Sequence, residues 1–251
     1  MLLSCQTDGY ELVWYDEFDY DGLPDTTMWS YDTQGNNKQW GNNELQFYTH
    51  GQPENVWVQN GKLFISALQT NDQDKPYTST RLITKGKGEW TYGKIEVCAK
   101  LAGGKGAWPA IWMLPSDDTY GQWPASGEID IMEYVGYESD SVYSTIHSGA
   151  YNHIEGTQKT SATFVSDAES AFHVYSLEWS EKSCQFFIDG RKHFEYNKGA
   201  KATSHEWPFD QSFYLILNIA VGGDWGGKYG VDESIFPCTM EVDYVRVYQR
   251  N

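Results

Sequence analysis

The sequence predicts an all-β fold in which two sheets pack together as a sandwich or jelly roll. Many short segments alternate apolar with polar residues, which is the pattern of strands with one buried face. Glycine-rich turns separate these segments, and no stretch of ten residues has apolar side chains at helical spacing. No repeat or linker divides the chain, so we expect an N-terminal tail over residues 1–9 and a single domain over residues 10–251.

Two hairpins are expected because their turns have a distinctive sequence. Asn60-Gly61 and Asp189-Gly190 are dipeptides that favour two-residue type I′ turns between strands. Residues 77–82 have the composition of one strand, whereas residues 103–109 are expected to form a flexible loop. The strands and hairpins are expected at the start of 10–19 and over 55–68, 77–82, 93–101, 110–114, 127–134, 141–147, 173–179, 184–196, 213–221 and 239–248.

Composition and charge restrict the class of ligand. The net charge is −17, from 35 acidic and 18 basic residues, which disfavours nucleic acid and also polyanionic polysaccharides. Aromatic residues make up 16% of the chain and include 11 tryptophans, whose flat faces suit the C–H surface of a sugar ring. No apolar run reaches the roughly 18 residues of a membrane span. A neutral polysaccharide is therefore the expected partner.

The cysteines bear on localisation. Cys5 follows Leu2-Leu3-Ser4, which resembles the end of a bacterial lipoprotein signal, although an incidental cysteine is the alternative. We expect an extracytoplasmic protein, secreted, periplasmic or anchored at the cell surface through Cys5. The other three cysteines cannot all pair, so the chain is no disulfide scaffold.

The strand at residues 127–134 carries three carboxylates. Alternation puts Glu128 and Asp130 on one face and two isoleucines on the other. Strict continuation would place Met132 beside the acids and bury Glu133, which is costly for an unpaired carboxylate. A β-bulge near Met132 would return Glu133 to the acidic face. Such a group suits glycoside hydrolysis with retention, which needs a nucleophile and an acid/base, while a solvated acidic strand or a calcium patch is the alternative.

The same stretch, GEIDIMEYVG, resembles the active-site strand of glycoside hydrolase family 16 in its bulged E-x-D-x-x-E form, which is associated with laminarinases. Further segments are similar to family signatures in the expected order: YDEFD, GNNELQFYT, YTSTR, YGKIEV, GAWPAIWML, STIH, NIAVGG and DYVRVY. The resemblance implies a β-jelly roll of two curved antiparallel sheets with a substrate cleft across the concave one. It implies Glu128 as nucleophile, Asp130 as its electrostatic helper and Glu133 as general acid/base.

The resemblance also implies which residues bind sugar. Trp112 and Trp123 match aromatic walls near the cleaved bond, Trp108 lies at the rim, and Trp225 is a further platform. Core packing is the alternative for these tryptophans. The matching polar residues are Asn42 and Arg81 on the non-reducing side, His147 beside the acid/base, and Asn218 on the cleft face. A buried Arg81–carboxylate pair and a structural histidine are the alternatives for two of them.

Many relatives bind a structural calcium ion away from the chemistry. The matching positions here are Glu17, Gly61 through its carbonyl, and Asp243, and hard oxygen ligands of this kind suit calcium. The resemblance implies no cofactor for catalysis.

The expected activity is that of a retaining endo-β-glucanase, a monomer that cuts laminarin, mixed-linkage β-1,3/1,4-glucan or both. A non-catalytic glucan-binding lectin is one alternative. A galactan hydrolase of the same family, acting on agar or carrageenan, is another. Transglycosylation would use the same residues.

Overall fold

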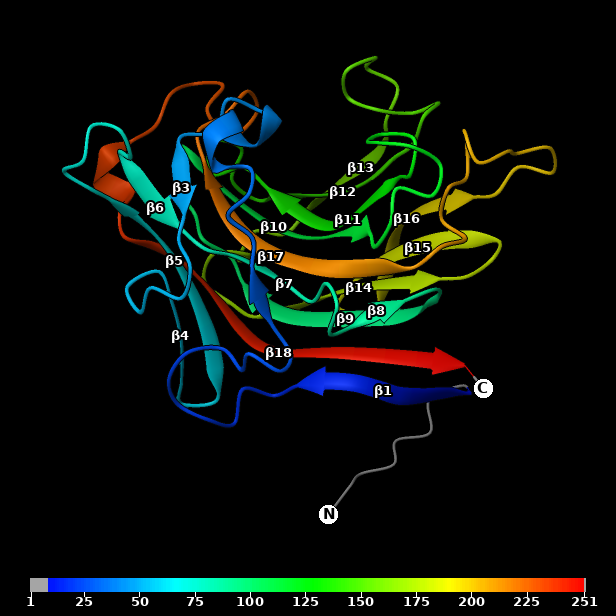
Figure 1. Cartoon of the computed structure of the whole chain (residues 1–251), viewed down its shortest axis with the longest axis horizontal. Coiled ribbons are helices and arrows are strands. Elements are labelled where there is room, and N and C mark those ends of the chain that lie inside the picture. The colour runs from blue at the N-terminus through cyan, green and yellow to red at the C-terminus, as the bar shows by residue number, and fades with distance from the viewer. Residues whose placement is uncertain (1–8, 251) are drawn as a thin grey trace.

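The structure is a computed structural model that describes residues 9–250 (Figure 1). Its ten-stranded sheet has the order β16-β15-β14-β9-β18-β5-β6-β3, with β1 beside β18 and β4 beside β5. Its eight-stranded sheet has the order β13-β12-β11-β10-β17-β7-β2, with β8 beside β17. The elements are β1 (Tyr10–Asp16), β2 (Ser30–Tyr31), η1 (Asn36–Gly41), β3 (Gln46–Tyr48), β4 (Val56–Gln59), β5 (Lys62–Gln69), β6 (Tyr77–Ser79), β7 (Arg81–Ile83), β8 (Glu89–Trp90), β9 (Gly93–Lys100), β10 (Ala107–Pro115), β11 (Glu128–Tyr134), β12 (Ser141–His147), β13 (Lys159–Phe164), β14 (His173–Trp179), β15 (Ser183–Ile188), β16 (Arg191–Asn197), β17 (Phe213–Val221), η2 (Glu233–Ile235) and β18 (Cys238–Arg250).

The predicted all-β jelly roll is confirmed. Within residues 9–250 the helices are two short 3₁₀ segments, η1 and η2. The strand pairs are antiparallel apart from β3 and β6, which run parallel. Both predicted hairpin turns have the backbone that type I′ requires. Asn60 and Gly61 have φ values of 52° and 71°, and Asp189 and Gly190 have values of 50° and 73°.

Three expectations about local structure need correction. Residues 77–82 are not one strand, because the chain leaves the ten-stranded sheet after β6 and enters the eight-stranded sheet as β7. The loop expected over 103–109 is shorter, since β10 already begins at Ala107. The strand β13 was missed because its sequence, KTSATF, has no continuous apolar face and so lacks a strand signal.

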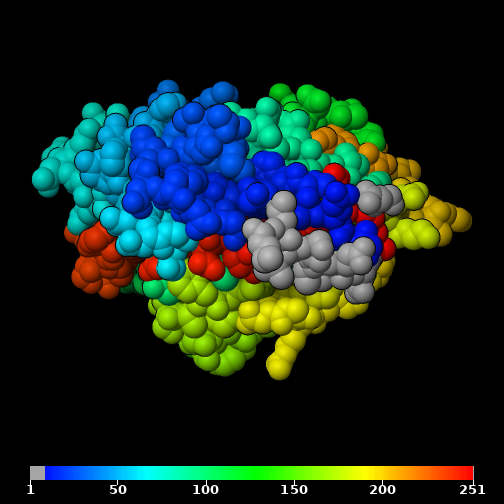
Figure 2. All heavy atoms as spheres, turned by 90° about the horizontal axis from the view of Figure 1, so that it is seen from below, coloured from blue at the N-terminus to red at the C-terminus, as the bar shows by residue number. Residues whose placement is uncertain are grey.

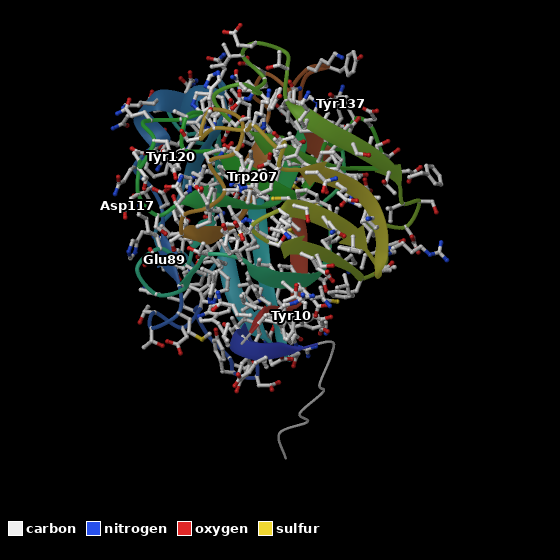
Figure 3. The ribbon with its side chains drawn as sticks, turned by 90° about the vertical axis from the view of Figure 1, so that its right-hand side faces the viewer. Tyr10, Glu89, Asp117, Tyr120, Tyr137 and Trp207 are labelled. Atoms are coloured by element: carbon white, nitrogen blue, oxygen red, sulfur yellow. The ribbon has the colours of Figure 1, made fainter. Side chains whose placement is uncertain are left out.

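The core lies between the two sheets and is unusually aromatic. Trp207 (Figure 3) is 1% exposed and stacks on Tyr196, with ring centroids 5.5 Å apart. Trp179 of β14 meets Phe213 of β17 edge-on at 5.3 Å, so this contact joins the two sheets. Every residue of β17 is buried, as expected for a strand at the centre of its sheet.

The first and last strands of the described chain lie side by side. β1 pairs with the end of β18, and Figure 2 shows this face from below. Cys98, Cys184 and Cys238 are free and buried, which agrees with the expectation of no disulfide scaffold. Cys5 and the predicted lipoprotein signal lie outside the described residues. No helix in the described part of the chain is long and apolar enough to cross a membrane.

Candidate active site

The predicted bulge is present in β11. Asp130 lies opposite Thr145 of β12, and Glu133 lies opposite Tyr143, so three steps along β11 match two along β12. The pairing of β11 with its other neighbour, β10, has a register shift at the same extra residue. One additional residue in β11 therefore separates Asp130 from Glu133.

The bulge puts the three carboxylates on one face. Their neighbours on β12 are His147, Thr145 and Tyr143, which alternate along that strand and so share a face. The residues between the acids face the core: Ile129, Ile131 and Met132 are each no more than 2% exposed. Met132 would have taken the place of Glu133 without the bulge, as the sequence pattern indicated.

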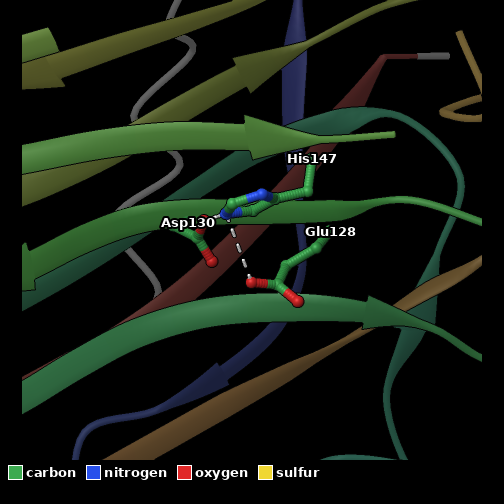
Figure 4. A group of neighbouring side chains, drawn as sticks. All are labelled: Glu128, Asp130 and His147. Atoms are coloured by element: carbon green, nitrogen blue, oxygen red, sulfur yellow. Dashed lines mark ion pairs between the residues drawn. The ribbon is translucent and has the colours of Figure 1, made fainter. Parts of the chain in front are cut away.

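Glu128 is the accessible member of the acidic pair at the start of β11. Its side chain is 16% exposed, whereas that of Asp130 is 2% exposed. The indole Nε1 of Trp123 donates a hydrogen bond to Glu128 Oε2 at 2.8 Å. The Nε2 atom of His147 lies 3.7 Å from Glu128 Oε1 (Figure 4). These two groups hold the Glu128 carboxylate in a defined position.

Asp130 is arranged to carry a proton. Burial raises its pKa well above the usual value, and the neighbouring charge of Glu128 raises it further. One carboxyl oxygen of Asp130 lies within 4.8 Å of one of Glu128, so a proton on Asp130 avoids two negative charges side by side. His147 Nε2 lies 3.3 Å from Asp130 Oδ2 and thus contacts both acids (Figure 4).

Glu133 has the properties of a general acid. Burial raises its pKa well above the usual value, and the negative charge of Glu128 acts in the same direction. His147 and the hydrogen bond from Trp108 oppose this shift. That bond runs from Trp108 Nε1 to Glu133 Oε1 at 3.2 Å. A carboxyl group that stays protonated beside an accessible carboxylate is what retaining hydrolysis requires.

A polar cluster lies across the sheet on β7 and β17. Arg81 is 7% exposed and lies opposite Asn218 in the strand register. Its guanidinium carbon is 4.4 Å from the Trp40 ring centroid and 4.5 Å from that of Trp112. Its Nε lies 3.3 Å from Asp32 Oδ2, so the buried ion pair considered as the alternative is present together with the stacking.

Asn218 links this cluster to the aromatic residues. Its Oδ1 accepts a hydrogen bond from Trp112 Nε1 at 2.7 Å, and its Nδ2 donates to the Tyr48 hydroxyl at 2.9 Å. Asn218 is 4% exposed. Its amide therefore orients Trp112 and is largely committed to protein partners.

Asn42 lies beyond the cluster, after η1. Its Nδ2 donates to Glu44 Oε1 at 3.0 Å, and its carbonyl accepts a bond from the backbone of Asp224 at 2.8 Å. Glu44, which sequence reasoning missed, is buried, and burial raises its pKa. Gln46 Nε2 donates a hydrogen bond to the other carboxylate oxygen of Glu44 at 2.6 Å.

The predicted tryptophans surround the carboxylates and none is buried. Trp108, Trp112, Trp123 and Trp225 each keep part of their surface exposed, so core packing does not account for them. Trp225 meets Trp108 edge-on at 5.4 Å and Tyr143 at 5.1 Å. The roles proposed for these side chains stay predictions, but their positions beside the acids agree with them.

His153 is a site residue that sequence reasoning missed. It lies in the loop between β12 and β13, 5.0 Å from the Trp123 ring and 5.3 Å from the His147 ring. Burial lowers its pKa, and the nearby His147 lowers it further. A histidine in an irregular loop has no sequence signal, because only the folded loop brings it to Trp123.

The surface hollows beside Trp57 and beside Phe47 do not include the three carboxylates of β11. Among the described residues, one group of His, Cys, Asp or Glu has its ligand atoms all within 4.8 Å, namely Glu128, Asp130 and His147. This group belongs to the catalytic centre, so it does not supply the predicted calcium site.

The three predicted calcium positions converge through strand register. β5 pairs with β18 as far as Val242, and β1 pairs with β18 from Val245, so Asp243 lies between the two partners. Gly61 precedes β5 and Glu17 follows β1. The Glu17 carboxylate, however, accepts two hydrogen bonds from Arg246, at 2.6 and 2.8 Å. Glu17 would therefore offer its carbonyl, as Gly61 would.

Comparisons with known proteins agree with this geometry. The profile of the family described as Glycosyl hydrolases family 16 matches residues 32–246. A curated beta-glucanase from Rhodothermus marinus is 50% identical over 252 residues, covering 98% of this chain and 87% of that protein.

Solved structures agree as well. The laminarinase from Rhodothermus marinus superposes with a TM-score of 0.93 at 49% identity, covering 96% of this chain and 98% of that one. A structure described as a non-specific endo-beta-1,3(4)-glucanase has a TM-score of 0.92 at 48% identity, covering 98% of this chain and 93% of that one. With the bulged acidic strand in place, the match over most of its length shows that this chain belongs to glycosyl hydrolases family 16.

Proposed function

We propose that the protein is a retaining endo-β-glucanase that hydrolyses internal bonds of β-1,3-glucan, of mixed-linkage β-1,3/1,4-glucan, or of both. The observation that carries the proposal is the bulge in β11, which puts Glu128, Asp130 and Glu133 on one face in different electrostatic environments. The names of the similar proteins, a beta-glucanase and a laminarinase, support the same substrate class.

The first chemical step would use Glu128 and Glu133 together. The Glu128 carboxylate attacks the anomeric carbon while Glu133 gives its proton to the leaving oxygen, so the glycosidic bond breaks and a glycosyl–enzyme ester forms. A protonated Asp130 carries no charge of its own beside Glu128, so Glu128 can stay ionised as nucleophile and as leaving group. Trp123 keeps the second Glu128 oxygen bonded throughout.

The second step reverses the roles. Glu133, now a carboxylate, removes a proton from water, whose oxygen attacks the anomeric carbon and releases Glu128. The raised pKa of Glu133 makes it a stronger base once it has lost its proton. The configuration at the anomeric carbon is retained because it is inverted twice.

Substrate charge favours a neutral glucan. The protein has a net charge of −17, and the polar cluster offers one arginine, Arg81, which is already paired with Asp32. A sulfated galactan would bring many negative charges toward this surface without matching cations. The sulfated members of the galactan alternative are therefore disfavoured.

The experiment is reducing-sugar release from laminarin, lichenan and barley glucan by the wild type and by Glu128→Ser. We expect release by the wild type and none by the variant, with the β-anomer appearing first in NMR spectra of the products. Retardation in a glucan gel without any release by the wild type would instead support the lectin alternative. The α-anomer as the first product would contradict retention.

We further propose that a calcium ion ties β18 to the turns that carry Glu17 and Gly61, with Asp243 as its carboxylate ligand. The strand register brings these three positions together, which supports the site. The Glu17 carboxylate accepts hydrogen bonds from Arg246, so Glu17 would bind the ion through its carbonyl. A chelator should lower the Tm of the wild type by several degrees and leave that of Asp243→Ala unchanged. Equal Tm values for the wild type with and without chelator would reject the ion.

The proposal for localisation is separate from the site. An extracytoplasmic protein, anchored through Cys5 in the lipoprotein case, would meet a polysaccharide that is too large to enter a cell. Mass spectrometry of the N-terminal peptide from the native host would show the lipid on Cys5 or its absence.

A further inference from the structure

The edge strand β13 exposes its side chains on the face that carries the catalytic acids. In the register with β12, Tyr143 lies opposite Ala162 and Ser141 lies opposite Phe164. Tyr143 itself lies opposite Glu133, and opposed residues in an antiparallel pair share a face. Ala162 and Phe164 therefore point to the same side of the sheet as Glu133. Both are exposed, while Ser161 and Thr163 on the other side are partly covered.

Phe164 is the most exposed large apolar side chain of the described residues. Its exposed fraction is 74%, compared with 70% for Ile154 and 61% for Tyr229. A single exposed apolar residue is common and needs no explanation by itself. The position of Phe164 is the informative feature, because it lies on the catalytic face and next to an aromatic row.

That aromatic row begins at the general acid. Trp108 donates its hydrogen bond to Glu133, Trp225 packs against Trp108 at 5.4 Å, and Tyr143 packs against Trp225 at 5.1 Å. Phe164 is the diagonal neighbour of Tyr143 across the β12–β13 pair, a distance of about 7–8 Å between such positions. The aromatic surface thus continues from Glu133 to the edge of the sheet.

The direction of the row identifies the part of the substrate that it would meet. Arg81 and Asn218 lie on β7 and β17, on one side of β11, whereas β12 and β13 lie on the other side. Glu133 protonates the leaving oxygen in the proposed reaction, and its direct neighbour on β12 is Tyr143. Because Arg81 matches a position on the non-reducing side of the cleaved bond, we assign the leaving part of the chain to the opposite, β13 side.

Strand geometry sets how far the leaving chain must extend. From Glu133 to Phe164 the path crosses two strand spacings and advances two residues, which gives about 12 Å between their α-carbons. A leaving group of a single sugar at Glu133 would not span this distance, whereas a leaving group of several sugars in a polymer would reach Phe164.

We propose that the exposed face of β13 is a platform for the leaving-group side of a neutral glucan, with Phe164 stacking on a sugar ring. Ala162 leaves room for the ring between Phe164 and the Thr160 hydroxyl, which is held at 2.9 Å by Thr145. The platform rests on the proposed endo-β-glucanase function. It makes the enzyme favour long chains over short ones.

The test compares a polymer with a short substrate. Phe164→Ala should lower kcat/KM on laminarin roughly threefold to tenfold, the range of one aromatic contact. It should leave kcat/KM on an aryl laminaribioside unchanged, because that leaving group ends beside Glu133. Phe164→Tyr should keep the wild-type value on laminarin. The matched control is Tyr15→Ala on β1 of the other sheet, whose side chain is 48% exposed, and it should change neither value.

A binding measurement separates failure of the platform from failure of the proposed function. In a laminarin gel, Glu128→Ser should be retarded more than the Glu128→Ser, Phe164→Ala double variant, whether or not the wild type hydrolyses laminarin. Equal retardation would overturn the platform, and so would an equal loss of kcat/KM on both substrates. A wild type that releases no sugar would reject the proposed function, and the gel result would still decide for or against the platform.

Discussion

The two sides of β11 are built differently. On the β7–β17 side, Arg81 and Asn218 are 7% and 4% exposed, and each is already bonded or stacked to protein partners. On the β12–β13 side, the aromatic row ends in Phe164, which is 74% exposed. The first side is rigid and polar, whereas the second is open and apolar.

This difference has a physical consequence for recognition. Polar groups that protein partners hold in fixed positions discriminate strongly, because a sugar must place its hydroxyl groups to match them. An exposed aromatic face contributes affinity with little dependence on the orientation of hydroxyl groups. The non-reducing side should thus select the sugar, and the leaving-group side should select chain length.

The largest expected effect is on chemistry common to both sides. Glu128→Ser should reduce hydrolysis of every glucan by about 10⁴-fold or more, because no nucleophile remains to form the covalent intermediate. Binding to laminarin should persist, since neither side of β11 is altered. Reducing-sugar assays and affinity gels measure the two properties, and measurable turnover by pure Glu128→Ser would refute its role.

A smaller but selective effect is expected on the polar side. Arg81→Lys should lower kcat/KM on short and long glucans alike, by about 10–100-fold, because lysine cannot stack its head group between Trp40 and Trp112. Phe164→Ala is expected to lower kcat/KM on polymers alone. The ratio of kcat/KM on a long glucan to kcat/KM on a short one therefore distinguishes the two sides. A loss confined to polymers in Arg81→Lys would break the comparison.

The pH dependence tests how Glu133 is tuned. The hydrogen bond from Trp108 stabilises the charged carboxylate and so lowers its pKa. Trp108→Phe should therefore raise the pKa of Glu133 and move the alkaline limb of the kcat profile to higher pH. A limb that moves to lower pH, or stays in place while kcat falls, would contradict this assignment.

The burial of Asp130 should also make the stability of the protein depend on pH. Burial raises the pKa of Asp130 in the folded state, so its contribution to stability is present below its unfolded pKa and is lost as pH rises through the folded pKa. Asp130→Asn should then raise Tm relative to the wild type at pH 8 more than at pH 4. Calorimetry at the two pH values checks it, and an equal shift at both would contradict it.

The smallest expected effect concerns the bulge. Ser144 Oγ donates to the Ile131 carbonyl at 2.7 Å, within the bulged segment of β11. Ser144→Ala should cost about 1–3 kcal/mol of unfolding free energy, because a buried carbonyl loses its partner. Any decrease in kcat/KM of Ser144→Ala should be the same on short and long substrates, because the bulge positions Glu133 for both. Thr160→Ala, which removes a hydroxyl on the exposed face of β13, is the matched control and should cost less.

The sequence by itself determined a large part of this protein. Alternation around Glu128 and Asp130, with Met132 at the wrong parity for Glu133, was enough to require the bulge and to put the acids on one face. Asn60-Gly61 and Asp189-Gly190 determined two hairpins, because few other dipeptides adopt left-handed conformations at both positions. These features are local, and local features follow from the residues themselves.

The tertiary structure alone decided the rest. The passage from β6 to β7 brings Arg81 beside Asn218, and a loop carries His153 to Trp123. Phe164 could not be assigned to a face until the pairing of β13 with β12 was known. The raised pKa values of Asp130 and Glu133 depend on burial and on the neighbouring charge of Glu128. Contacts between distant segments and the dielectric environment are properties of the packed sheets, and alternation within one strand does not encode them.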